Sequence, residues 1–292
     1  MTTRRFGPYR VEIKHEEKVL FPDAGVTKGQ LIDYYQAVAE VMLPHLRDRA
    51  LTLHRFPDGI GTDGFYQQQA GDYFPDWILR KTLPKEGGEV EHLICNNTAT
   101  LVYLANQACI TPHCWLSRID APDQPDRLVI DLDPADGDFG KVRDAARLVA
   151  DAFDELGLAV YAQVTGSRGI HVVAPIRRGP GFDAVRGRLR AIAGRLATEH
   201  PDLLTMEQRK DKRGRRIYLD TTRLAYGQTM VAPYALRARP GAPVATPILR
   251  DELDDDGLRP DRWNLESVLD RIADLGDPWK DIGRAARKLD LE

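Results

Sequence analysis

The chain has 292 residues, 42% of them hydrophobic and 29% charged, a mixture typical of a globular protein and not of a disordered or fibrous one. Its 41 basic and 44 acidic residues give a net charge of −3, which excludes a uniformly positive protein that coats nucleic acid but not a local basic face. With no apolar run of about 18 residues and three cysteines that form no C-x-x-C pair, the sequence favours a reducing, intracellular compartment over membrane or secretion.

The N-terminal third predicts one long helix followed by short strands. Thr27 precedes Gln30 at the spacing of a capping box, and apolar residues then recur at helical intervals as far as Leu46. We therefore expect a helix of roughly five turns. Residues 51–94 are interrupted by Gly and Pro and are rich in aromatic residues, which is typical of short strands joined by long loops.

The rest of the chain alternates strands and helices irregularly, which favours a mixed α/β fold with antiparallel sheet over a doubly wound parallel sheet. We expect strands at 128–130, 158–164, 170–176 and 217–220, helices at 142–156, 183–198 and 265–275, and an acidic exposed loop at 249–260. The strands at 158–164 and 170–176 are joined by a short glycine-containing turn, so they are predicted to form a hairpin.

Two carboxylates follow the predicted strand at 128–130. Asp131 and Asp133 project from one face of an extended strand and Leu132 from the other, so the acidic pair shares a small volume. Oxygen ligands in that arrangement suit Mg²⁺ or Mn²⁺. The same spacing recurs at residues 136–138 and 254–256, so a solvated or capping role is the alternative on the pattern alone.

Three further features are compatible with phosphate chemistry. The turn at 165–169 has small residues that let backbone N–H groups approach an anion. Ser167 and Arg168 belong to this turn and His171 follows it. A plain glycine hairpin is the alternative. Asp220 ends another strand and is either a third metal ligand or an ordinary strand-end acid.

Basic and aromatic clusters have the same two interpretations, as solvated or core residues and as nucleic-acid contacts. Five of the seven residues at 210–216 are basic, and cations can neutralise phosphates despite the acidic total. Phe65 and Tyr66, in a loop region with Arg55 nearby, offer a stacking platform for a base.

Several of these motifs occur in an order that resembles the polymerase domain of bacterial ligase D, a branch of the archaeo-eukaryotic primase superfamily. The motifs are Lys18–Pro22 with Thr27-Lys28, Phe65–Gln67, Asp131–Pro134, Gly166–His171 and Ala232–Arg237. The resemblance implies an α+β primase-polymerase fold, in which an RRM-like catalytic β-sheet packs against an N-terminal α/β unit. It further implies a single domain over 1–292, with a DNA-binding part at about 1–115 and a catalytic part at about 116–292.

The resemblance also assigns roles to particular residues. Two divalent ions, Mn²⁺ or Mg²⁺, would be held by Asp131, Asp133 and Asp220. The nucleotide would be bound by Ser167, Arg168, His171 and Arg237. A DNA 5′-phosphate would be bound by Lys18 and Lys28, and the template by Arg55, Phe65 and Tyr66. Gln68 and Arg223 depart from the Lys and Gln that are usual in the family.

The implied function is template-directed addition of nucleotides, with a preference for NTPs over dNTPs, to a primer 3′-hydroxyl at short gaps or breaks that bear a 5′-phosphate. The expected setting is DNA repair, including non-homologous end joining, in the bacterial cytoplasm at the nucleoid. A DNA ligase and end-binding repair proteins are the expected protein partners, and no membrane is involved. The alternatives are a non-catalytic binder of 5′-phosphorylated DNA ends and a metal-dependent phosphohydrolase acting on nucleotides or DNA ends.

Overall fold

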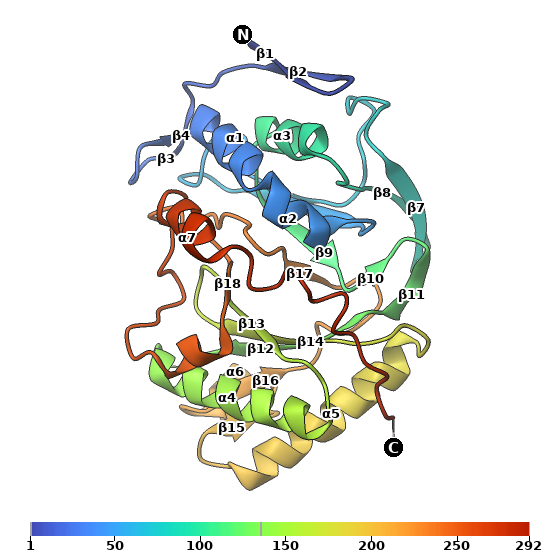
Figure 1. Ribbon diagram of the computed structural model, residues 1–292, viewed down its shortest axis with the longest axis vertical. Coiled ribbons are helices and arrows are strands. Elements are labelled where there is room, and N and C mark those ends of the chain that lie inside the picture. Colours follow the sequence, from blue (N-terminus) through green and yellow to red (C-terminus); the bar gives the residue numbers. More distant parts are fainter. Residues whose placement is uncertain (1, 135, 292) are drawn as a thin grey trace. The chain divides into compact units, whose positions relative to one another are not determined.

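The computed structural model describes residues 2–134 and 136–291, which form two compact units built from interleaved stretches of chain (Figure 1). Unit 1 takes in the chain up to Asp120 together with Thr229–Ala245 and Trp263–Gly276. Unit 2 takes in Ala121–Gln228, Thr246–Arg262 and the chain from Asp277 onward. Each unit therefore combines segments that are far apart in the sequence.

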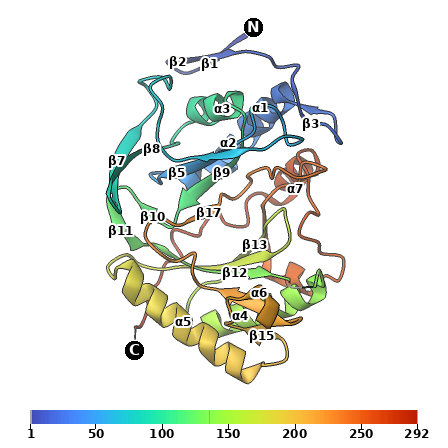
Figure 2. The ribbon, with the colours of Figure 1, turned by 180° about the vertical axis from the view of Figure 1, so that it is seen from behind.

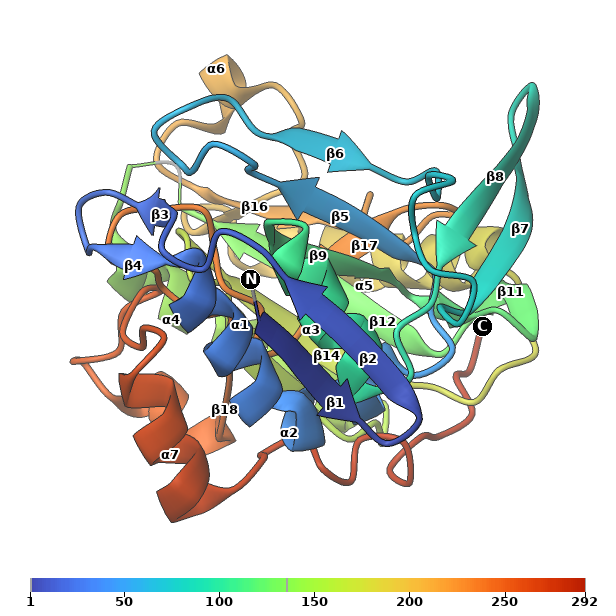
Figure 3. The same ribbon diagram turned by 90° about the horizontal axis from the view of Figure 1, so that it is seen from above.

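Unit 1 is organised around an antiparallel sheet with the strand order β17-β9-β5-β6. These strands are β5 (Leu51–Arg55), β6 (Phe65–Gln67), β9 (Cys109–Trp115) and β17 (Thr229–Val231). The other elements of unit 1 are β1 (Thr2–Phe6), β2 (Tyr9–Ile13), β3 (Val19–Phe21), β4 (Val26–Thr27), α1 (Lys28–Ala37), α2 (Ala39–Leu46), β7 (Arg80–Lys85), β8 (Gly88–Leu93), α3 (Thr98–Asn106), β10 (Ser117–Arg118) and α7 (Ser267–Leu275). The β1–β2 ribbon contacts α3, as the view from above shows (Figure 3).

The first helix begins where the sequence predicts but is divided. The hydroxyl of Thr27 accepts a hydrogen bond from the backbone N–H of Gln30 at 3.3 Å, and the Gln30 side chain accepts one from the Thr27 N–H at 2.9 Å. This capping box satisfies two N–H groups that a helix start leaves without partners. The single five-turn helix is wrong, because α1 ends at Ala37 and α2 begins at Ala39, with Val38 between them.

Unit 2 is organised around a six-stranded sheet with the order β15-β16-β12-β14-β13-β18, in which only the β15–β16 pair is parallel. Its strands are β12 (Arg127–Asp133), β13 (Tyr161–Val164), β14 (Ile170–Pro175), β15 (Leu204–Thr205), β16 (Ile217–Asp220) and β18 (Thr246–Ile248). The other elements are β11 (Ala121–Pro125), α4 (Phe139–Glu155), α5 (Phe182–Glu199), α6 (Lys210–Arg213) and the 3₁₀ helix η1 (Arg250–Asp254). Both long helices, α4 and α5, lie on the same side of this sheet (Figures 1 and 2).

The predicted hairpin is confirmed as the antiparallel β13–β14 pair, and the strand at 217–220 has the predicted bounds. The acidic segment at 249–260 is largely exposed, as predicted, but it contains a 3₁₀ helix instead of being a plain loop. Leu253 and Leu258 are buried in it, and the carboxylate of Asp256 pairs with Arg143 of α4 at 2.5 Å. Burial of the two leucines fixes the segment as η1 and the turns after it. Among the described residues, no helix is both long and apolar enough to cross a bilayer.

Candidate active site

Strand β12 ends in the acidic pair, and its neighbours in the sheet add polar side chains beside it. Asp131 lies opposite Asp220 of β16 on one side and opposite His171 of β14 on the other. Residues directly opposite in antiparallel strands share a face of the sheet, as do residues two apart in one strand. One face therefore carries Asp131, Asp133, Asp220 and His171, whereas Leu132 projects to the other face and is fully buried.

His171 and Arg223 contact the carboxylates of this row. His171 Nε2 lies 3.4 Å from Oδ1 of Asp131. The Nε of Arg223 lies 3.6 Å from Oδ2 of Asp131 and 3.8 Å from Oδ2 of Asp220. The other oxygen of Asp220 accepts hydrogen bonds from the backbone N–H and the hydroxyl of Thr222, at 2.8 and 2.6 Å. Each oxygen of Asp131 and of Asp220 thus has a defined neighbour.

Asp133 lies at the open end of the row, where its Oδ2 is 3.5 Å from a guanidinium nitrogen of Arg168. Burial and the nearby negative charge of Asp131 raise the pKa of the Asp133 carboxyl. A cation beside the pair would oppose that shift. The carboxylates line a pocket of about 360 Å³ that Arg168, Arg213 and Arg223 also line.

The turn between β13 and β14 holds Arg168 and His171 beside β12. Gly166 has a φ of +63°, a left-handed conformation that favours glycine. The backbone N–H of Thr165 donates to the carbonyl of Gly169 at 2.9 Å, and the N–H of Gly169 donates back to the Thr165 hydroxyl at 3.2 Å. A Cβ at Gly169 would lie 2.0 Å from the Leu132 carbonyl oxygen, so only glycine permits the turn to lie this close to β12.

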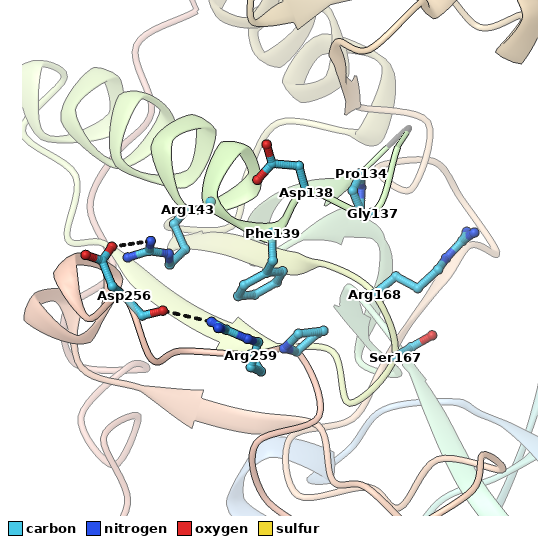
Figure 4. A pocket seen from close by; sticks show the side chains of 11 residues that line it. Pro134, Gly137, Asp138, Phe139, Arg143, Ser167, Arg168, Asp256 and Arg259 are labelled. Carbon is cyan, nitrogen blue, oxygen red and sulfur yellow. Dashed lines mark hydrogen bonds and ion pairs between the residues drawn. The ribbon is translucent and has the colours of Figure 1, made fainter.

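Ser167 of the same turn lies in an adjoining pocket of about 760 Å³. Arg168 and Pro134 line both pockets, and Arg143 and Arg259 line the second one. Figure 4 shows Ser167 and Arg168 on one side of this second pocket and the Arg143–Asp256 ion pair on the other. Ser167 and Arg168 therefore line cavities that share Arg168 and Pro134, whereas the buried His171 lines neither of them.

The basic segment at 210–216 contributes to the carboxylate pocket through α6. Lys210 and Arg213 line this pocket, and the Arg213 guanidinium lies 4.0 Å from the ring centroid of Tyr218. The sequence marks the segment as basic but does not indicate which of its residues reach the carboxylates. Their positions depend on the pairing of β16 with β12, which is a long-range contact.

The three carboxylates offer hard oxygen donors on one face, the chemistry that Mg²⁺ and Mn²⁺ prefer. As the side chains stand, no group of three or more His, Cys, Asp or Glu residues within 2–134 and 136–291 is arranged to hold a metal ion. The carboxylates of Asp131 and Asp220 instead meet Arg223, and that of Asp133 meets Arg168. The oxygen chemistry of these three side chains is compatible with a divalent ion.

In unit 1, Lys18 and Lys28 are brought together across the β3–β4 ribbon. The backbone N–H of Lys28 donates to the carbonyl of Lys18 at 2.8 Å. The Lys18 ammonium pairs with Asp58 at 2.6 Å, and that of Lys28 donates to the carbonyl of Asn106 at 3.3 Å. Burial lowers the pKa of Lys28, whose side chain is almost covered. The two lysines, ten positions apart in sequence, are thus neighbours in the fold, with Lys18 partly exposed and Lys28 almost covered.

Phe65 and Tyr66 are exposed on the edge strand β6, with 45% and 63% of their surfaces accessible. The Tyr66 ring stacks on His54 at 4.1 Å between centroids. Arg55, in contrast, is buried. Its guanidinium lies 5.3 Å from the centroid of the Phe65 ring.

The Arg55 guanidinium is held by several partners within unit 1. It donates to the Gln67 side chain at 2.7 Å, to the Tyr73 hydroxyl at 2.5 Å and to the Gln107 carbonyl at 2.8 Å. These bonds hold the Arg55 guanidinium in place beneath the aromatic rings. Of the three predicted template-binding residues, only Phe65 and Tyr66 are exposed to solvent.

The predicted site residues are divided between the units. Unit 2 holds the carboxylates with Ser167, Arg168 and His171, whereas unit 1 holds the paired lysines, the aromatic surface and Arg237. The backbone N–H of Arg237 donates to Pro243 at 2.8 Å, and its charge acts on His54. A role for Arg237 in nucleotide binding stays a prediction.

Comparison with known proteins finds similarity to one family. The family model described as "LigD, primase-polymerase domain" matches residues 27–279. The multifunctional non-homologous end joining protein LigD of Mycolicibacterium smegmatis is 32% identical over 271 residues, which cover 92% of this chain and 35% of that protein. The bifunctional non-homologous end joining protein LigD of Bacillus subtilis is 30% identical over 270 residues, which cover 92% of this chain and 43% of that protein. The chain thus spans less than half the length of these relatives.

A solved structure, the polymerase domain from Mycobacterium tuberculosis ligase D in complex with DNA, is similar with a TM-score of 0.88 and 30% sequence identity. The likeness covers 95% of this chain and 99% of that one. It confirms the α+β primase-polymerase fold that the sequence motifs imply.

Proposed function

We propose, from the premise that this chain belongs to the LigD primase-polymerase domain family, that it is a metal-dependent, template-directed nucleotidyltransferase. The single observation that carries the proposal is the row of carboxylates on one face of the sheet, with Asp131 directly opposite Asp220. Next to this row lies a turn suited to binding an anion, and cationic side chains line the same pocket. Carboxylates beside cations are what transfer of a nucleotide from a triphosphate requires.

In the proposed reaction a primer 3′-oxygen attacks the α-phosphorus of the bound nucleotide. The new P–O bond forms as the bond between the α-phosphorus and the α–β bridging oxygen breaks, pyrophosphate leaves, and the hydroxyl proton passes to solvent. Asp131, Asp133 and Asp220 would hold two divalent ions, Mn²⁺ or Mg²⁺, which would supply positive charge to offset the negative charge that develops on the reacting oxygens. Arg168, Ser167 and His171 hold the phosphates, and Lys210 and Arg213 neutralise their charge.

The DNA contacts of the proposal lie in unit 1. The ammonium groups of Lys18 and Lys28 bind the 5′-phosphate on the downstream side of a gap or break. The exposed rings of Phe65 and Tyr66 stack on a template base, which is a sequence-tolerant contact. Arg55 supports these rings through its bonds to Gln67 and Tyr73.

The proposed setting is repair of gaps and breaks in bacterial DNA, with NTPs preferred over dNTPs. The support is that the relatives are non-homologous end joining proteins and that the similar solved structure contains DNA. A DNA ligase and end-binding repair proteins are proposed as partners, and the nucleoid in the cytoplasm as the location. Arg237 is proposed to add positive charge to the nucleotide site.

The test is primer extension on a one-nucleotide gap with a 5′-phosphate, with each NTP and dNTP in Mn²⁺ or Mg²⁺. The wild-type protein should lengthen the primer, and the double variant Asp131→Ala with Asp133→Ala should not. The control is Asp151→Asn with Asp154→Asn, which removes two exposed carboxylates of α4 that pair with Arg250. A wild-type protein that binds the gap without extending it would support the binding-only alternative, and shortened DNA or free nucleoside monophosphate would support the phosphohydrolase.

A further inference from the structure

Arg223 lies where two carboxylate oxygens of the candidate active site converge. Oδ2 of Asp131 and Oδ2 of Asp220 both face its Nε, at 3.6 and 3.8 Å. The second oxygen of each carboxylate has another neighbour: Oδ1 of Asp131 lies 3.4 Å from His171 Nε2, and Oδ1 of Asp220 accepts hydrogen bonds from Thr222. The two Oδ2 atoms are therefore the oxygens of this pair that face Arg223.

The contact of Arg223 with these oxygens is close enough for electrostatic attraction but too long for a hydrogen bond. The Arg223 side chain is 46% exposed, whereas those of Asp131 and Asp220 are 12% and 18% exposed. The carboxylates are thus held in place, while the guanidinium has an open route to solvent. Such a cation neutralises the pair and can be displaced without moving the strands.

We propose that Arg223 is a resident cation that a divalent metal ion must displace from Asp131 and Asp220, so that it sets the metal concentration the protein needs. The inference rests on the proposed metal-dependent function, because it concerns the same carboxylates. A guanidinium and a divalent ion cannot share the two Oδ2 atoms, since both carry positive charge and both require the same oxygens. Metal binding must break the interaction of Arg223 with the two carboxylates. The free energy of that interaction therefore weakens the affinity of the protein for the metal.

The test is a direct titration of the DNA-free, nucleotide-free protein with Mn²⁺, followed by calorimetry and by the loss of the electron paramagnetic resonance signal of free Mn²⁺. Arg223→Gln removes the charge and should bind Mn²⁺ about tenfold more tightly, which corresponds to about 1.4 kcal/mol. Arg223→Met is a second neutral variant that keeps an unbranched side chain and should behave alike. Arg223→Lys keeps the charge and should stay close to the wild type.

The matched control is Arg147→Gln, which removes one positive charge from the same unit at an exposed ion pair with Asp254. It should leave the Mn²⁺ affinity unchanged, and this separates the local contact from the net charge. A second measurement is thermal stability, where Mn²⁺ should raise the melting temperature of Arg223→Gln more than that of the wild type. Unchanged or weaker Mn²⁺ binding by both neutral variants would overturn the proposal.

The failure of this inference is distinguishable from failure of the proposed function. If the wild type extends primers and the neutral variants bind Mn²⁺ no more tightly, then Arg223 is not the competing cation and the polymerase assignment stands. If Mn²⁺ binds tightly to Arg223→Gln but no variant extends a primer, the displacement is supported and the polymerase assignment fails. If Asp131→Asn binds Mn²⁺ as well as the wild type does, the carboxylate row is not the metal site and both fail.

Discussion

Gln163 of β13 lies directly opposite His171 of β14, and its Nε2 is 3.1 Å from Nδ1 of the imidazole. The Gln163 side chain is fully buried. If the amide N–H donates to Nδ1, the ring proton lies on Nε2, the nitrogen that faces Asp131. Gln163 is in this way a positioning residue for His171, held by the pairing of two strands.

We expect Gln163→Leu to raise the KM for NTP by about tenfold, the equivalent of about 1.4 kcal/mol, and to change kcat less. The reason is that the imidazole loses the partner that fixes its tautomer while the carboxylate row is retained. Single-nucleotide incorporation kinetics measure the two constants, and ¹⁵N chemical shifts of the imidazole report the tautomer. Equal losses in kcat and kcat/KM, with an unchanged tautomer, would contradict the positioning role.

A second prediction concerns the close approach of the β13–β14 turn to β12. Gly169→Ala should destabilise the protein by about 1–3 kcal/mol, because its Cβ would lie 2.0 Å from the Leu132 carbonyl oxygen and 2.7 Å from a carboxylate oxygen of Asp133. Primer extension should fall by about a hundredfold, since the displacement reaches a proposed metal ligand. Urea denaturation and extension assays measure the two effects.

The matched control for that variant is Gly187→Ala. Gly187 lies within α5, and a Cβ there would meet nothing within 4 Å. Alanine is a better helix former than glycine, so this change should stabilise the protein by up to about 1 kcal/mol and leave extension unchanged. An active, undestabilised Gly169→Ala protein would show that the turn can move away from β12 at little cost.

A third prediction concerns acid stability. Burial, together with the positive charge of Arg237, lowers the pKa of His54 from 6.5 to about 4. The folded state therefore disfavours protonation, and the unfolded chain binds more protons between these two pH values. The contribution of neutral His54 to stability is full above about pH 6.5 and is lost as the pH falls toward 4.

His54→Gln should consequently lose less stability than the wild type between pH 7 and pH 4.5. Urea midpoints at the two pH values measure the difference. His15→Gln is the control, because His15 is largely exposed and should show the same loss as the wild type. Parallel losses in all three proteins would place the acid sensitivity elsewhere, for example at His92, whose pKa burial also lowers.

The sequence predicts those parts of the site whose signals are local. Asp131 and Asp133 follow an apolar strand, and the hairpin that carries His171 is marked by its glycines at 166 and 169, because residue alternation and turn chemistry act over a few positions. The capping box at Thr27 is of the same kind and is confirmed.

The remaining features depend on contacts between segments far apart in the chain. The pairing of β16 with β12 sets Asp220 opposite Asp131 and brings Arg223 to both carboxylates, and no local pattern specifies that register. The ordering of 249–260 likewise depends on the burial of Leu253 and Leu258, which only the folded chain provides. In the sequence Arg223 differs from the Gln that is usual in the family, but only the fold brings it to the acidic row.

A fourth prediction concerns Lys18 and Lys28 of unit 1. Lys18→Ala with Lys28→Ala should weaken binding to a gap with a 5′-phosphate much more than binding to the same gap with a 5′-hydroxyl. Each charge-assisted contact is typically worth about 1.5–3 kcal/mol, so the loss should be about tenfold or more per lysine. Fluorescence anisotropy with the two labelled gaps measures it, and equal losses on both would remove the phosphate-binding role.

Asp58→Asn should change DNA binding in the opposite direction, through the same lysine. The Asp58 carboxylate pairs with the Lys18 ammonium at 2.6 Å and is largely exposed, so a phosphate that binds Lys18 has to compete with it. Removing that negative charge should tighten binding to the 5′-phosphorylated gap, by about threefold at low salt and less at high salt because exposed charges are screened. The 5′-hydroxyl gap should be little affected, since it brings no terminal phosphate to Lys18. A gain of the same size on both substrates would instead mean that Asp58 repels the DNA backbone in general.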